Sequence, residues 1–142
     1  MSEGDGGSGR VAEGGCRCGA VRLRASGGPF TVVYCYCVDC RRSSGAPVSL
    51  FAGYETGRVD LDREATRSYS SSRGVIRSFC AACGTPVSYE DRRLEGEIYL
   101  HVGIFDDPER FEPEAHNWVS QKPLWLKISD DLPRHLQSSI PR

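Results

Sequence analysis

The chain has 142 residues, of which 39% are hydrophobic and 26% charged, and its formal net charge at pH 7 is −1. Because no run of Lys or Arg exceeds two residues, the composition argues against nucleic acid or an acidic membrane surface as a partner. We find no apolar run near the roughly 20 residues of a transmembrane helix, and no secretory signal at the N-terminus. The sequence therefore predicts one domain, of cytoplasmic location and without a membrane partner.

In chain order, the predicted elements are a tail and then short strands separated by Gly, Pro, Asp and Ser. Residues 1–13, rich in Gly, Ser and acidic side chains, predict a flexible tail, and residues 14–142 a single folded domain. Runs of β-branched and aromatic residues predict strands at 20–25, 30–34, 48–52, 66–70, 75–79, 85–89, 97–102 and 123–128. Short helical turns are expected after Asp39 and between Asp106 and Phe111. The predicted class is mainly β.

Seven cysteines, the only ones in the chain, form three tight clusters, none of them isolated. In a reducing compartment such clusters indicate metal or redox sites rather than disulfides. A structural zinc takes four thiolates, whereas a catalytic zinc takes three protein ligands and keeps one open position. Four plus three accounts for every cysteine, which predicts two zinc ions per chain. The clusters are Cys16 and Cys18, then Cys35, Cys37 and Cys40, then Cys80 and Cys83.

The glycines after two of these clusters indicate which cysteines share a metal. Gly19 follows Cys18 and Gly84 follows Cys83, at the point where a tight turn around a metal favours positive φ. This pattern groups the first and third clusters as one closed site, and leaves the middle cluster as a second site. Spacing leaves open whether that second site is a catalytic one or is closed by a fourth ligand. The available imidazoles are His101, His116 and His135.

Residues 14–21, 35–46 and 77–86, with later stretches at 116–118, 122–125 and 130–133, resemble the glutathione-dependent formaldehyde-activating enzyme family. The resemblance implies a β-tent fold of small antiparallel sheets held by a structural zinc. It implies the condensation of glutathione with formaldehyde to S-hydroxymethylglutathione, a carbon–sulfur lyase reaction in reverse. By similarity, the structural ligands are Cys16, Cys18, Cys80 and Cys83, and the catalytic ligands are Cys35, Cys37 and Cys40. The chain departs from the family at Tyr36, where a histidine is common.

The sulfur-rich middle site favours binding a thiolate or polarising a carbonyl, so we expect a small-molecule thiol or aldehyde as substrate. Arg41 and Arg42 could offset the negative charge of the thiolates or hold a carboxylate, or simply be solvated. We expect Asp39 to accept backbone hydrogen bonds in its turn and Tyr36 to pack in the core. Exposed edge strands would allow a homodimer.

Several other residues have both a functional and an ordinary interpretation. His116 is the imidazole most expected to line a pocket, although an ordinary hydrogen-bonded histidine is the commoner case. His101 fits a strand histidine, and His135 is given no role. Trp118 and Trp125 are expected in the core or a pocket wall, and residues 68–72 at a strand edge.

Two other functions are compatible with the cysteine pattern. The same domain occurs in a centromere protein, and a nucleotide-exchange chaperone is related by fold, so a non-catalytic, zinc-stabilised binding module is the main alternative. A redox switch at Cys80 and Cys83 is a third interpretation, and it would require a free thiol of low pKa.

Overall fold

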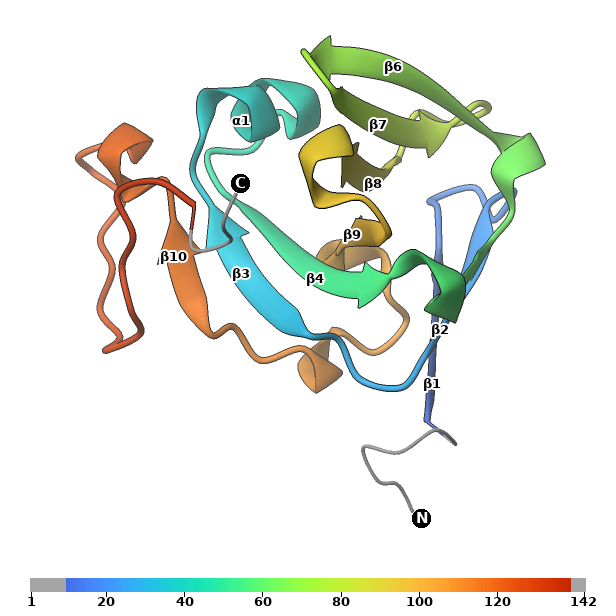
Figure 1. Cartoon of the computed structure of the whole chain (residues 1–142), viewed down its shortest axis with the longest axis horizontal. Helices are drawn as coiled ribbons and strands as arrows, with labels where there is room; N and C mark the ends of the chain where they lie inside the picture. The colour runs from blue at the N-terminus through green and yellow to red at the C-terminus, as the bar shows by residue number, and fades with distance from the viewer. Residues whose placement is uncertain (1–9, 139–142) are drawn as a thin grey trace.

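The structure, a computed structural model, describes residues 10–138, and within them the chain is mainly β (Figure 1). One α-helix, α1 (Val38–Ser44), lies among these residues. The strands are β1 (Val11–Gly15), β2 (Arg22–Ser26), β3 (Thr31–Cys35), β4 (Ser49–Glu55), β5 (Val59–Leu61), β6 (Thr66–Ser72), β7 (Val75–Cys80), β8 (Pro86–Asp91), β9 (Glu97–His101) and β10 (Ala115–Asn117). The 3₁₀ turns are η1 (Thr56–Arg58), η2 (Arg63–Ala65), η3 (Arg92–Leu94), η4 (Val102–Ile104), η5 (Pro108–Arg110) and η6 (Val119–Gln121).

The strands form two sheets. The small sheet has the order β1-β2-β5 and is antiparallel. The large sheet has the order β10-β3-β4-β9-β8-β7-β6, and it is antiparallel except for β10, which pairs parallel to β3. Figure 1 shows the large sheet curving from β10 at one side to β6 and β7 at the other, where β1 and β2 lie. The predicted mainly β class is therefore confirmed, as a pair of antiparallel and mixed sheets.

The large sheet buries different side chains on its two faces, because neighbouring residues in a strand point to opposite sides. On one face, Tyr54, Ile98 and Leu100 join the main core, which also includes buried residues of β1 and β2. On the other face, Phe51 and Tyr99 pack in a second cluster with Cys40 of α1. The first face holds the two sheets together. The second face positions the middle cysteine cluster.

The structure departs from the sequence prediction at both ends of the described chain. Residues 11–13 belong to β1 and not to a tail, since Val11 pairs with Ser26 and Ala12 is buried. Arg10 directly precedes β1, and residues 1–9 of the predicted tail lie outside the described residues. The strand predicted at 123–128 is wrong: this segment is a loop in which Lys122 Nζ donates to the carbonyl oxygens of Pro123 and Leu126.

The remaining predicted strands are confirmed, with ends shifted by a few residues. The helical turn expected after Asp39 is α1, which begins before it, at Val38, and the turn expected between Asp106 and Phe111 is η5. Three strands were not predicted: β1, which begins inside the predicted tail, and the short strands β5 and β10. The last two have three residues each, which is too few to show an alternating pattern. No helix among residues 10–138 has the length and apolar character needed to cross a bilayer.

Candidate metal sites and the cavity beside them

Four cysteines meet where the small sheet approaches the end of β7. Cys16 follows β1, Cys80 ends β7, and Cys18 and Cys83 lie in the turns that follow them. Their four Sγ atoms all lie within 4.8 Å of one another. The Sγ of Cys18 is 3.6 Å from that of Cys16 and 3.7 Å from that of Cys80. The structure thus brings together the first and third clusters of the sequence.

These sulfur separations fit a tetrahedral zinc. Two sulfurs bound at 2.3 Å and at the tetrahedral angle lie roughly 3.8 Å apart. Backbone amides already point at the sulfurs, since Val21 N donates to Cys16 Sγ at 3.1 Å and Cys83 N donates to Cys80 Sγ at 3.3 Å. Gly19 and Gly84 have φ of 86° and 84°, so both turns use the left-handed conformation that the glycines predicted.

The three middle cysteines form a second group around the start of α1. Cys35 ends β3, Cys37 caps the N-terminus of α1, and Cys40 lies within it. Their Sγ atoms also lie within 4.8 Å of one another. Among residues 10–138, no histidine or carboxylate joins either group, so none of the three imidazoles is placed as a fourth ligand. A three-thiolate set of this kind has the soft donors that zinc accepts.

Close contact among the three sulfur atoms gives the three cysteines different pKa values. Contacts from the Cys35 and Cys40 side chains lower the pKa of Cys37 to about 2. The same close contact with Cys37, together with Cys40 and burial, raises the pKa of Cys35 well above its usual range. The cluster therefore holds one thiolate easily but resists further deprotonation. A bound cation would compensate this repulsion, because metal binding requires the thiolate form of each ligand.

Arg77 supplies the positive charge beside this cluster, a role that the sequence analysis did not assign. It is 4% exposed, and its Nη2 lies 3.3 Å from Cys40 Sγ and 2.8 Å from Asp39 Oδ2. Its Nε donates to Ser71 Oγ at 2.8 Å, and its guanidinium lies 4.9 Å from the ring centroid of Tyr89. Burial opposes the charge, but Cys40 and Asp39 more than offset it and raise the pKa of Arg77.

Arg41 and Arg42, for which this role was one of two interpretations, do not line the cavity that the middle cysteines face, and the exposed Arg42 fits the solvated alternative. The expectation for Asp39 is wrong, because its carboxylate accepts hydrogen bonds from the side chains of Arg77 and Ser71 and not from the turn backbone. These partners lie in β6 and β7, more than 30 residues further along the chain.

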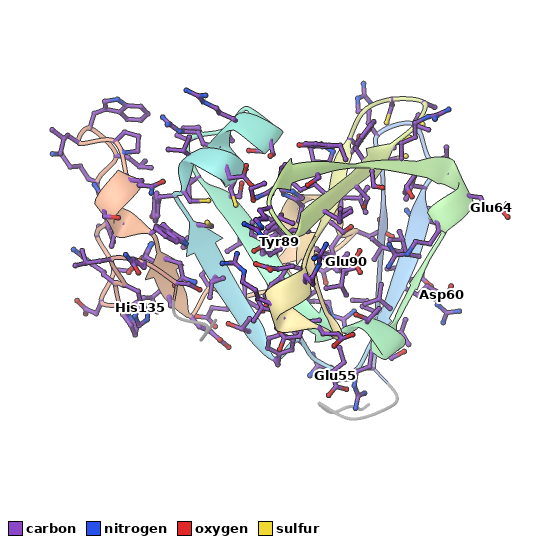
Figure 2. The ribbon with its side chains drawn as sticks, turned by 45° about the horizontal axis from the view of Figure 1, so that its top comes forward. Glu55, Asp60, Glu64, Tyr89, Glu90 and His135 are labelled. Atoms are coloured by element: carbon purple, nitrogen blue, oxygen red, sulfur yellow. The ribbon has the colours of Figure 1, made fainter. Side chains whose placement is uncertain are left out.

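A cavity of about 700 Å³ opens onto the middle cluster. All three of its cysteines line this cavity, whereas none of the other four does. Aromatic side chains from β4, β8 and β9 line it, together with residues of β10 and of the segment after it; Tyr89 lies near the centre of the molecule in Figure 2. The lining includes Phe51, Tyr89, Tyr99, Arg77, Arg93, Asn117, Trp118, Gln121 and Gln137.

His116 does not line this cavity. Its Nδ1 lies 2.7 Å from Tyr36 Oη, and its Nε2 lies 3.0 Å from Asp130 Oδ1. The ring is buried and stacks on Tyr34 with 4.8 Å between centroids. His116 is thus the ordinary hydrogen-bonded histidine of the two interpretations. Tyr36 is buried as predicted, and this chain of contacts fixes the C-terminal segment to β10 and β3.

Most of the other residues named from the sequence, which are two histidines, two tryptophans and residues 68–72, have structural roles. His101 packs on Phe51 at 4.6 Å, and burial followed by the charge of Arg77 lowers its pKa to about 4. His135 lies at the periphery beside β10, as Figure 2 shows. Trp118 lines the cavity, whereas Trp125 is 69% exposed, which contradicts the expected core or wall position. Residues 68–72 lie in β6, the edge strand of the large sheet, as predicted.

Comparison with known proteins agrees with this arrangement. The profile of the family described as "Glutathione-dependent formaldehyde-activating enzyme" matches residues 11–121. A Halomonas elongata protein named "Putative glutathione-dependent formaldehyde-activating enzyme" is 29% identical over 128 residues, covering 83% of this chain and 81% of its own. An uncharacterized lyase of Schizosaccharomyces pombe is 26% identical over 111 residues, covering 78% and 80%.

One solved structure supports the fold alone. A Rhodobacter sphaeroides protein superposes with a TM-score of 0.56 at 23% sequence identity, covering 66% of this chain and 87% of that one. The family profile spans both cysteine groups and most of the cavity wall. The chain therefore belongs to the glutathione-dependent formaldehyde-activating enzyme family.

Proposed function

We propose that this protein is a zinc-dependent carbon–sulfur lyase that joins a thiol to a small aldehyde and reverses that reaction, with glutathione and formaldehyde as the model pair. Family membership and a lyase-named relative support the reaction class. The proposal includes a β-tent type of fold and a cytoplasmic location, because thiolate metal sites persist in reducing compartments.

The observation that carries the proposal is the different setting of the two cysteine groups. Only the group formed by Cys35, Cys37 and Cys40 faces the cavity, and among residues 10–138 it has no fourth protein ligand. We assign the catalytic zinc to this group. A structural zinc is assigned to Cys16, Cys18, Cys80 and Cys83, which do not line the cavity. When bound at the open group, zinc supplies a Lewis acid able to bind sulfur or polarise a carbonyl oxygen.

The residues around the cavity have complementary tasks. Arg77 donates to Cys40 Sγ, which offsets negative charge on the three-thiolate group, and Asp39 and Ser71 hold its guanidinium in place. Phe51 and Tyr99 form an apolar wall that keeps water from the reacting atoms. A volume of about 700 Å³ also lies within the range of pockets that enclose a ligand larger than a small aldehyde.

The test must measure catalysis above the spontaneous reaction of thiols with formaldehyde. Glutathione and formaldehyde at equilibrium are followed by NMR exchange spectroscopy, which reports the rate of interconversion with S-hydroxymethylglutathione. The wild-type protein should accelerate exchange, and Cys37→Ser should abolish the acceleration while the four-cysteine group keeps its zinc. Arg42→Ala, an exposed change within the helix that Cys37 caps, is the matched control and should remain active. Absence of acceleration by zinc-loaded wild type across a panel of small thiols would refute the lyase proposal.

A further inference from the structure

Asn117 stands beside Cys35 on the cavity side of the large sheet. Strand β10 pairs parallel to β3, with Asn117 opposite Cys35 and His116 opposite Tyr34. Paired residues point to the same face of a sheet, and successive residues alternate. The stacking of His116 on Tyr34 occupies one face, so the Asn117 side chain lies on the other, where Cys35 and the cavity are.

The burial of the Asn117 side-chain amide is unfavourable for the stability of the fold. The residue is 4% exposed, and its Oδ1 is buried without a hydrogen-bond partner among residues 10–138. A buried acceptor left unpaired is unfavourable, and such atoms in native proteins call for an explanation. The next residue, Trp118, has φ of 60°, the only positive value of a non-glycine residue in the described part of the chain. Unpaired polar atoms and strained backbone gather at sites that bind ligands.

The position of Asn117 indicates which part of a ligand it would meet. It is one strand away from Cys35, hence close to the reacting atoms and far from the outer parts of a bound thiol. The neighbouring amide of Gln121 is already used, since its Oε1 accepts from Val38 N at 2.7 Å. Arg77 carries donors only. The free acceptor of Asn117 therefore matches a hydroxyl group formed at the reaction centre.

We propose that Asn117 is a substrate-binding residue whose amide oxygen accepts the hydroxyl hydrogen of the thiol–aldehyde adduct, and that this contact selects S-hydroxymethyl compounds. The inference rests on the proposed lyase function. In the lyase direction the hydroxyl proton leaves oxygen, the carbon–oxygen double bond forms, and the carbon–sulfur bond breaks with its electron pair going to sulfur. That sulfur takes up one proton, so one adduct gives one thiol and one aldehyde, without any oxidant or reductant.

Asn117→Ala tests this role, because it removes a buried side-chain oxygen that has no hydrogen-bond partner among residues 10–138, and so should not unfold the protein. We expect the catalysed rate of exchange to fall about tenfold to hundredfold, as for the loss of one well-placed hydrogen bond. Zinc content and the urea midpoint should stay at wild-type values. Arg42→Ala, which truncates an exposed side chain outside the cavity lining, is the control and should keep the wild-type rate.

A binding measurement separates recognition of the hydroxyl from general damage to the cavity. S-ethylglutathione has an ethyl group where the adduct has hydroxymethyl, so wild type should bind it more weakly than the adduct. In Asn117→Ala the two ligands should bind equally, with the affinity for S-ethylglutathione unchanged. An active wild type together with a fully active, folded Asn117→Ala would overturn the inference alone. An inactive, zinc-loaded wild type would overturn the lyase function and this inference with it.

Discussion

Arg77→Gln should destabilise the protein by about 3 kcal/mol, and the structure gives the reason. Removing one partner of a buried ion pair costs roughly 3–5 kcal/mol, because the other charge is left uncompensated. The Arg77 side chain is 5% exposed, but the Asp39 side chain is 35% exposed and stays partly hydrated. The lower end of that range is therefore expected. The substitution also removes the contact between Nη2 and Cys40 Sγ, so we expect it to alter how the middle cysteine group binds a metal.

Urea denaturation of the zinc-loaded protein measures the loss of stability. The thiolate-to-metal absorption of the cobalt-substituted protein measures the change in metal binding. Arg42→Gln provides the control, since this side chain is exposed on α1, the helix that carries Asp39 and Cys40; its cost should stay within about 0.5 kcal/mol. An Arg77→Gln variant that unfolds at the wild-type urea concentration and leaves the cobalt spectrum unchanged would refute this prediction. That result would mean that Asp39 and Cys40 do not depend on the guanidinium.

Three further predictions concern stability. Cys83→Ser should lower the free energy of unfolding more than Cys37→Ser, because the four-cysteine group joins distant segments; equal urea midpoints would contradict this. The pKa of His101 is lowered from 6.5 to about 4, so the neutral ring contributes fully to the free energy of unfolding above pH 6.5. This contribution is lost as pH falls toward 4. Between pH 7 and pH 4, wild type should lose about 3 kcal/mol of unfolding free energy in urea titrations that His101→Asn does not lose. Equal losses in the two proteins would refute the lowered pKa of His101. Tyr36→Phe should cost about 1–3 kcal/mol by leaving His116 Nδ1 unpaired, with zinc content unchanged; loss of zinc would instead place Tyr36 in the metal group.

The cysteine groups could be predicted because their turns are local. A glycine directly after Cys18 or Cys83 reports on the φ that the turn requires, and both glycines have the positive φ that was expected. The mainly β class was equally accessible, since strands such as β7 and β9 carry dense β-branched and aromatic residues. These signals lie within a few residues of the feature that they predict.

The cavity could not be predicted in the same way, because its residues meet through strand register. Arg77 reaches Asp39 only because β7 passes beside α1, and nothing near Arg77 in the chain indicates that contact. Among the imidazoles, the sequence indicates His116 as the one most expected to line a pocket, and it assigns no role to Asn117. The parallel pairing of a three-residue strand, β10, places His116 on Tyr34 and turns Asn117 to the cavity.

The most direct test of the two-site account is the zinc content per chain, by elemental analysis of protein purified without added metal, before and after brief treatment with a mild chelator. The account predicts two zinc ions that fall to one, with the remaining ion lost only in a variant of the four-cysteine group, such as Cys83→Ser. A single, tightly held zinc that added zinc cannot supplement would contradict the assignment of a second metal to Cys35, Cys37 and Cys40. The protein would then be a zinc-stabilised binding module.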